Sequence, residues 1–371
     1  MGKKIMGLLL VLTCMIFSAW AAVYVKKSGL FRPYPDKEYL TAEEEAERPI
    51  YRQLSDNEKA LYTAVYRGVL EHEDEIALPY DADGESYSRI YCLIEKQEGG
   101  LFWLDSTYYT AQKLRDASIV YRTEDNTERE RMAGKLEKAV QVAFSGVPEG
   151  AGEFELALYI HDYIINKCRY TTSGLNTFGA TVYGCLVDGE AHCEGYAKAF
   201  QYLCAQVGIE CVVVTGVTSD GENHAWNQVE IDGEWFNVDV TWDDLDVETG
   251  GRHLYFMCDD EFMSKSHTAE VAYFTPFECN SESSWFTRKG LFIDTIDDAE
   301  SVIRREVAAG NKAIELKFDE INVYSAFKKD YLEGEKIFDI IMENTAEIPE
   351  NGVTVTLREN EEDLFMTVLI S

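Results

Sequence analysis

A cysteine stands where the sequence predicts the start of an amphipathic helix. Cys193 follows a loop of small and polar residues, and the apolar side chains of Tyr196, Phe200 and Leu203 recur after it at helical spacing. This spacing places the sulfur on the buried face of the first turn, where unpaired N–H groups and the positive end of the helix dipole stabilise an anion. A thiolate in that position is a nucleophile, although a buried structural thiol accounts equally well for the helix taken alone.

A predicted β-hairpin after this helix carries a histidine and an acid. Its turn is the Asp-Gly pair at residues 232–233, and the register that this turn sets places Trp226 opposite Asp239 and His224 opposite Thr241. Because side chains alternate along a strand, these four residues share one face. The other face is apolar and is predicted to pack on the core; it holds Val229, Ile231, Phe236, Val238 and Val240. His224 and Asp239 are then diagonal neighbours, and the carboxylate can orient the imidazole.

Cysteine, histidine and aspartate in these positions predict thiol acyl-transfer chemistry. Cys193 attacks an amide carbonyl, His224 takes the thiol proton and then protonates the leaving amine, and Asp239 fixes the imidazole tautomer. The backbone N–H of Cys193 is a natural oxyanion donor at the helix start. Taken singly, His224 is interpreted as a histidine with a structural role only, and Asp239 as a solvated acid. Their joint appearance with Cys193 favours the catalytic interpretation.

Three aromatic residues are candidates for secondary roles at this site. Tyr183 is a candidate for the second oxyanion donor, although most tyrosines in such a loop simply pack. Trp226 and Trp242 are predicted to wall the cleft. For Trp242 the hairpin register favours core packing instead, because it places this residue on the apolar face.

No metal and no organic cofactor are predicted. A site built from His192, Cys193, Asp243, Asp244 and Asp246 is conceivable, but the spacing of these residues matches no metal-ligand pattern. Four further histidines are interpreted as structural; they are His161, His192, His253 and His267. No C-x-x-C pair occurs among the nine cysteines, which argues against a zinc ribbon or a thioredoxin-type redox pair. Most of them are predicted to be buried small hydrophobes.

The residues of the predicted site also carry a family resemblance. The segments CEGYAKAFQYLCAQVGIECVVVTG, from Cys193, and NHAWNQVEIDGEWFNVDVTWDD, from Asn223, resemble the transglutaminase-like superfamily, in particular its bacterial, extracytoplasmic members. The resemblance covers residues 150–275, and the flanking FWL and IHDYI segments fit the same group more loosely. It implies a papain-like core in which Cys193 lies at a helix N-terminus and packs on an antiparallel sheet that carries His224 and Asp239. Related members include protein cross-linkers, peptidases, amidases and inactive scaffolds.

The chain is predicted to be an α+β protein of several parts. After the Cys193 helix come three strand-like runs, IECVVVTGV, HAWNQVEI and EWFNVDVTW, and a helix followed by an antiparallel meander is typical of the α+β class. We expect a signal peptide or membrane anchor at 1–27, an exposed linker at 28–50 and a mostly helical region at 51–148, in which the segment RIYCLIEKQEGGLFWLDSTYY is predicted to form short strands or turns. The catalytic domain is expected at 149–278 and a small α+β unit at 279–371.

Composition and charge exclude some functions. The 371 residues are 46% hydrophobic, which is enough to bury a full core. The formal net charge of −33 repels phosphate backbones, so nucleic acid is not an expected partner. Residues 5–25 form an uncharged, mostly apolar run flanked by lysine pairs, long enough to span a bilayer and also similar to a secretory signal. Either interpretation places most of the chain outside the cytoplasm.

The expected function is acyl transfer on amide bonds of proteins or peptides, and those of the cell envelope are candidate substrates. Water as acceptor makes the protein a peptidase or amidase, and a lysine amine makes it a transglutaminase. Hydrolysis is favoured slightly, because water is always available and no amine-specific entrance is recognisable in the sequence. The alternative is an inactive cell-surface scaffold or binding module on the same fold. The sequence predicts no oligomeric state.

Overall fold

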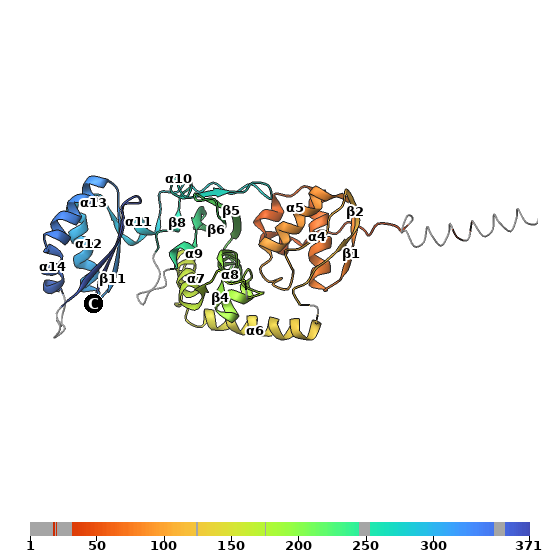
Figure 1. Ribbon diagram of the computed structural model, residues 1–371, viewed down its shortest axis with the longest axis horizontal. Coiled ribbons are helices and arrows are strands. Elements are labelled where there is room, and N and C mark those ends of the chain that lie inside the picture. Colours follow the sequence, from red (N-terminus) through yellow and green to blue (C-terminus); the bar gives the residue numbers. More distant parts are fainter. Residues whose placement is uncertain are drawn as a thin grey trace, which may run out of the picture.

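The computed structural model describes residues 18, 20, 32–123, 125–174, 176–244, 253–344 and 353–371. Three parts follow one another along its long axis: an N-terminal part, a central part built on a sheet, and a C-terminal part (Figure 1). The mixture of helices and antiparallel sheet confirms the predicted α+β class. Within the described residues no helix is both long and apolar enough to cross a membrane. The predicted apolar span at 5–25 lies outside these residues, apart from Ser18 and Trp20.

The N-terminal part consists of helices and one antiparallel strand pair. Its elements are α2 (Ala42–Ala46), α3 (Pro49–Arg52), α4 (Asp56–Leu70), β1 (Glu75–Asp83), α5 (Gly84–Gln97), β2 (Lys113–Ser118) and α6 (Asn126–Phe144). Ser55 and Glu58 form a capping box at the start of α4. Residues 32–39 of the predicted linker are exposed, whereas part of the segment after them packs on the N-terminal part: Leu40 and Ile50 are buried, and Arg48 forms an ion pair with Glu98 at 2.8 Å.

Helix α5 includes RIYCLIEKQ, the first part of the segment that was predicted to form short strands or turns. Asp83 caps the helix by accepting a hydrogen bond from the Ser86 N–H. Tyr87, Ile90 and Ile94 are then buried on one face at helical spacing. The prediction was wrong because the aromatic and β-branched residues suggested strands, whereas the period of the buried positions is that of a helix.

The central part places helices α7 (Glu153–Lys167) and α8 (Cys193–Gln206) against a five-stranded antiparallel sheet. The strand order is β8-β7-β6-β5-β9, with β5 at Cys211–Thr218, β6 at Asn223–Ile231, β7 at Glu234–Val238, β8 at Phe256–Cys258 and β9 at His267–Ala269. A short parallel pair, β3 (Arg169–Tyr170) and β4 (Glu190–Ala191), and the single-turn helix η1 (Gly184–Asp188) lead into α8. Between β7 and β9 lie α9 (Val240–Asp243) and α10 (Asp260–Met263).

The predicted hairpin register is confirmed, but the ribbon is shorter than predicted. Ile231 pairs with Glu234, and the pairing continues to Asn227 and Val238. Strand β7 ends there, and Asp239 caps the short helix α9. The predicted pairs beyond Val238 do not form, because the Asp239 side chain accepts hydrogen bonds from the first N–H groups of α9 and so starts a helix.

Helix α8 is fixed to the sheet and to the N-terminal part by buried polar contacts. The buried Asn227 amide donates to the carbonyl of Ala197 on α8, at 2.9 Å, and to the carbonyl of Val212 on β5. The buried Lys198 ammonium lies 2.7 Å from a Glu95 carboxylate oxygen on α5 and 2.8 Å from one of Glu194. Removing either partner of such contacts leaves an unpaired buried group, so they hold the helix in one position.

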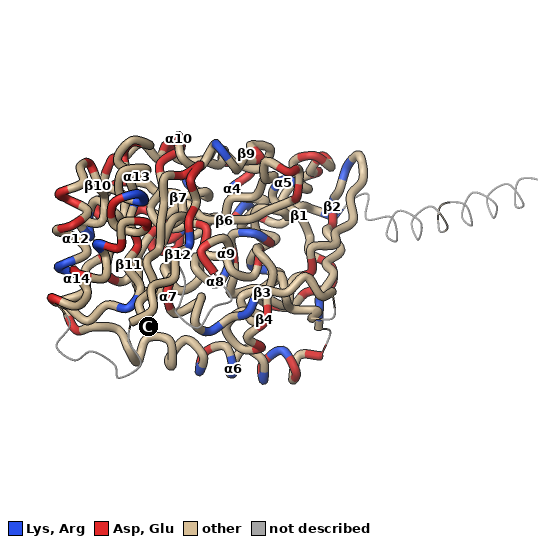
Figure 2. The backbone as a smooth tube through the Cα atoms, turned by 60° about the vertical axis from the view of Figure 1, so that its left-hand side comes forward, with Lys and Arg blue, Asp and Glu red and all other residues tan. Residues whose placement is uncertain are grey.

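The C-terminal part is a small α+β unit, as predicted. Its sheet has the order β10-β11-β13-β12, with helices on one side (Figure 1). The elements are α11 (Trp285–Lys289), β10 (Phe292–Ile293), α12 (Ile296–Ala308), β11 (Ala313–Phe318), α13 (Ile321–Phe327), η2 (Lys328–Glu333), α14 (Lys336–Asn344), β12 (Val355–Asn360) and β13 (Phe365–Ile370). One connected cluster of buried apolar side chains runs through all three parts. The chain has 67 acidic and 34 basic residues, and acidic positions are spread along the backbone of all three parts (Figure 2).

The start of α8 depends on a glycine. A Cβ atom at Gly195 would lie 2.4 Å from the Gly179 carbonyl oxygen and 2.7 Å from the Ala191 Cβ. We therefore predict that Gly195→Ala lowers the free energy of unfolding by about 1–3 kcal/mol, the usual cost of overpacking. Urea unfolding followed by circular dichroism measures this change.

Gly134 in α6 supplies the matched control. A Cβ there meets no atom within 4 Å. Gly134→Ala should leave stability unchanged or raise it by up to about 1 kcal/mol, because alanine favours the helix. Equal effects of the two substitutions would show that the tight helix start is not under steric constraint.

Candidate active site

Cys193 is the first residue of α8, as the sequence predicts. Its side chain is half-buried and packs on Ala197, Val213 and Ala225, which come from α8, β5 and β6. The loop before it is held by the hydrogen bond from the His192 N–H to the Gly179 carbonyl oxygen. The sulfur is thus positioned by the helix and by the two central strands of the sheet, while part of it remains accessible.

His224 and Asp239 lie side by side, although not through the predicted strand pairing. His224 Nε2 is 2.6 Å from Asp239 Oδ2, and the carboxylate is fully buried. His224 comes from β6, whereas Asp239 follows the last residue of β7. His224 also interacts with the sulfur: a hydrogen bond with Cys193 and the charge of Cys193 both raise the pKa of His224. Because Nε2 is taken by Asp239, the nitrogen that faces Cys193 is Nδ1.

The Asp239 carboxylate is saturated with hydrogen bonds. Oδ1 accepts from the N–H groups of Thr241 and Trp242 at 3.0 and 3.1 Å. Oδ2 lies near His224 and also 3.1 Å from Nε2 of His267, the first residue of β9. The second ring nitrogen of His267 is 2.8 Å from the Ser266 hydroxyl. His267, which the sequence analysis interpreted as structural, therefore belongs to the site as a residue that positions Asp239.

The interactions between His224 and Asp239 shift the pKa of each residue toward its charged form. Burial alone lowers the pKa of His224, but hydrogen bonds and charges from Asp239 and Cys193 outweigh it and raise the pKa to about 10. For Asp239, burial raises the pKa, and the hydrogen bonds with His224 and His267 bring it down to about 2. At neutral pH the imidazole is therefore protonated and the carboxylate ionised.

Two tryptophans pack around the histidines. The ring of Trp226 stacks on His224 with centroids 6.3 Å apart, and the ring of Trp242 lies 5.6 Å from His224 and 4.3 Å from His267. The expectation that Trp242 lies on the apolar face of the ribbon was wrong, because the strand ends before it. Half-buried Trp242 instead packs against both imidazoles. That the two rings wall a substrate cleft stays a prediction.

Tyr183, the candidate for the second oxyanion donor, lies away from the site, whereas Tyr170 lies close to it. The Tyr183 ring packs against Phe102 and Phe178, and the charged groups that act on its hydroxyl are Asp188, Arg131 and Glu128, none of them in the site. Tyr183 is therefore a packing residue. Tyr170 on β3 lies nearer: after burial, the charges of Cys193 and Asp239 contribute most to raising the pKa of its phenol. Its pairing with Ala191, two residues before the cysteine, depends on strand contacts that sequence periodicity does not reveal.

The set of residues weighed as a metal site does not assemble. The Asp243 carboxylate is buried 3.2 Å from His161 Nε2 and accepts the Tyr255 N–H. Burial raises the pKa of Asp243 to about 6. Asp244 accepts a hydrogen bond from the Tyr196 hydroxyl, and Asp246 lies outside the described residues. Asp243 and Asp244 therefore serve the packing of α7, α8 and the segment before β8.

Comparison with known proteins finds similarity centred on this site. Residues 141–240 match the family model of the transglutaminase-like superfamily. Kyphoscoliosis peptidase of Mus musculus is 35% identical over 91 residues, which cover 22% of this chain and 14% of that protein. The match thus spans only a small fraction of the relative's length.

Among solved structures, similarity extends to a candidate cysteine protease from Cytophaga hutchinsonii and to a TGase. The first is 21% identical, with a TM-score of 0.26 over 29% of this chain and 37% of that chain. The second is 15% identical, with a TM-score of 0.28 over 38% of this chain and 37% of that chain. TM-scores this low do not establish a shared overall fold. The family match contains Cys193, His224 and Asp239, and the part of the chain that carries the site belongs to the transglutaminase-like superfamily.

Proposed function

We propose that this protein is a thiol hydrolase that cleaves amide bonds in proteins or peptides. The observation that carries the proposal is the convergence of Cys193, His224 and Asp239, in which one imidazole bridges a half-buried sulfur and a fully buried carboxylate. A histidine that only stabilises the fold has no need of a partly accessible thiol on its second nitrogen. This arrangement is what nucleophilic catalysis by cysteine requires.

The reaction proceeds through a thioester. The Cys193 thiolate attacks the amide carbonyl, and the N–H groups at the start of α8 face the developing oxyanion. The His224 imidazolium gives its proton to the leaving amine, which completes acylation of the sulfur. The now neutral ring takes a proton from water, hydroxide adds to the thioester, and the thiolate leaves with release of the carboxylic acid. Asp239 keeps the ring in the required orientation throughout.

The electrostatics support the ion pair as the resting state. Asp239 stays ionised down to about its pKa of 2, and His224 stays protonated up to about its pKa of 10. The pair Cys193–His224 holds one proton in this range, and the Asp239 charge favours its location on the ring. The substitution Asp239→Asn removes that preference and shifts the proton toward sulfur.

Alkylation of Cys193 by iodoacetamide tests this charge state. We expect the protein to react faster than free cysteine near pH 7, because a protonated His224 beside the sulfur favours attack by the sulfur on the reagent. Asp239→Asn should react more slowly near pH 7 and recover as the pH rises and the pair loses its last proton. Cys193→Ala identifies labelling of the other cysteines.

His224→Ala separates the enzyme from a scaffold that has lost turnover. On the proposed mechanism it abolishes the rapid alkylation, because no ring remains to hold the thiol proton. A Cys193 thiol that reacts no faster than free cysteine, and is indifferent to this substitution, would contradict the catalytic role.

Product analysis distinguishes hydrolysis from cross-linking. The protein is incubated with a glutamine-containing protein and a labelled primary amine, and both products are quantified by mass spectrometry. We expect free carboxylic acid to dominate, because water reaches a half-buried sulfur without a dedicated entrance. Dominant amine incorporation would identify a transglutaminase instead. Cys193→Ala should abolish either product.

We further propose that the catalytic part is exported. The support is the uncharged apolar run at residues 5–25, flanked by lysine pairs. A C-terminal alkaline phosphatase fusion, which is active only after export to an oxidising compartment, should be active with the intact N-terminus and inactive when residues 5–25 are deleted. Inactivity of both fusions would contradict export.

A further inference from the structure

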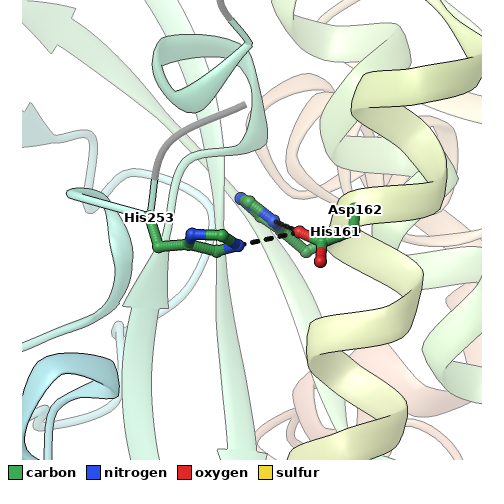
Figure 3. A group of neighbouring side chains, drawn as sticks. All are labelled: His161, Asp162 and His253. Atoms are coloured by element: carbon green, nitrogen blue, oxygen red, sulfur yellow. Dashed lines mark hydrogen bonds and ion pairs between the residues drawn. The ribbon is translucent and has the colours of Figure 1, made fainter. Parts of the chain in front are cut away.

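A second cluster of histidines and acids shares no residue with the thiol site. His161 and Asp162 come from α7, and His253 lies in the segment before β8 (Figure 3). Asp162 Oδ1 is 3.0 Å from His161 Nδ1 and 2.9 Å from His253 Nε2, so two imidazoles converge on one carboxylate oxygen. All three atoms lie within 4.8 Å of one another. Nothing in the proposed hydrolysis uses these residues.

The remote nitrogen of each imidazole contacts a further carboxylate. His161 Nε2 lies 3.2 Å from Asp243 Oδ2, and His253 Nδ1 lies 3.3 Å from both oxygens of Glu315 on β11. A carboxylate on the remote nitrogen is the usual partner of a metal-bound histidine, because it fixes the ring and strengthens the nitrogen that faces the ion. Here both histidines have such a partner, and in both the other nitrogen faces Asp162.

The spacing and the surroundings suit a small cation. Ligands that are about 2.0–2.1 Å from a tetrahedral ion lie roughly 3.3 Å apart, so shifts of a few tenths of an ångström open the cluster sufficiently. A cavity of about 410 Å³ adjoins it, and its lining includes the polar residues Asn166, Glu306 and Asn311 together with Lys289 and apolar side chains. The Asp162 side chain is 45% exposed, which gives an ion and its water ligands a route from solvent.

We propose that His161 Nδ1, Asp162 Oδ1 and His253 Nε2 bind a divalent cation of the zinc type, with water completing the coordination. Two imidazoles and one carboxylate favour such an ion over calcium or magnesium, which prefer all-oxygen sites. Binding displaces the protons that now link the rings to Asp162. Through His253 and Glu315 the ion stabilises the contact between the transglutaminase-like part and the C-terminal sheet.

Metal titration of the full-length protein tests the site. The Cys193→Ala variant is used, so that the reactive thiol does not take the ion, and zinc binding is measured by calorimetry after treatment with a chelator. We expect one equivalent to bind and to raise the melting temperature. Asp162→Asn and His253→Gln, each in the same background, should weaken binding on the order of 100-fold and remove the thermal shift. Circular dichroism verifies that each variant folds without metal.

Glu306→Gln is the matched control. Its carboxylate lines the same cavity but bonds to Arg305 and Asn311 rather than to the cluster, so zinc affinity should stay within about twofold. Zinc that still binds when Asp162 and His253 are replaced occupies another site, such as His224, Asp239 and His267, and overturns the proposal.

A cobalt spectrum decides the matter even if the substitutions prevent folding. In the folded Cys193→Ala protein, one equivalent of Co²⁺ should give the intense visible bands of four- or five-coordinate ligation. Only the weak bands of hydrated cobalt would contradict a site built from these residues.

Discussion

The candidate active site depends on one buried carboxylate at the end of a strand. Asp239 is fully buried, and burial of an ionised acid is tolerated only when its oxygens are hydrogen-bonded. Two backbone N–H groups and two imidazoles fulfil this requirement. The same contacts end β7, start α9 and fix the ring of His224. Local chain geometry and the charge state of the site therefore have a common cause.

The position of Cys193 is set by a second group of constraints. A hydrogen bond from Asn227 on β6 connects α8 to the sheet. An ion pair of Lys198 connects α8 to α5 of the N-terminal part. Gly195 lets the helix start approach the loop at Gly179. The N-terminal part thus contributes to holding the nucleophile, although it supplies no reacting group. Its packing helps to hold α8, and with it the Cys193 thiol, beside the imidazole of His224.

The sequence was sufficient where the signals were local. The Asp-Gly turn predicted the hairpin register correctly, and apolar spacing predicted α8 with its cysteine. The juxtaposition of His224 and Asp239 was expected, but from two strand pairs that do not form. The sequence offered no way to see that Asp239 would cap a helix, since its capping role competes with strand extension. His267 was missed because its contact with Asp239 joins residues 28 positions apart across the sheet. The helical period of α5 was present in the sequence but was hidden by residues with strand preference.

The central claim is that Asp239 keeps His224 protonated at neutral pH, beside Cys193. Nitrogen-15 NMR of the histidine rings measures this most directly, with the His224 signals assigned by comparison with His224→Ala. The account predicts that both ring nitrogens of His224 carry a proton at about pH 8, well above the ordinary histidine pKa. A neutral His224 ring with a single protonated nitrogen at that pH would contradict it.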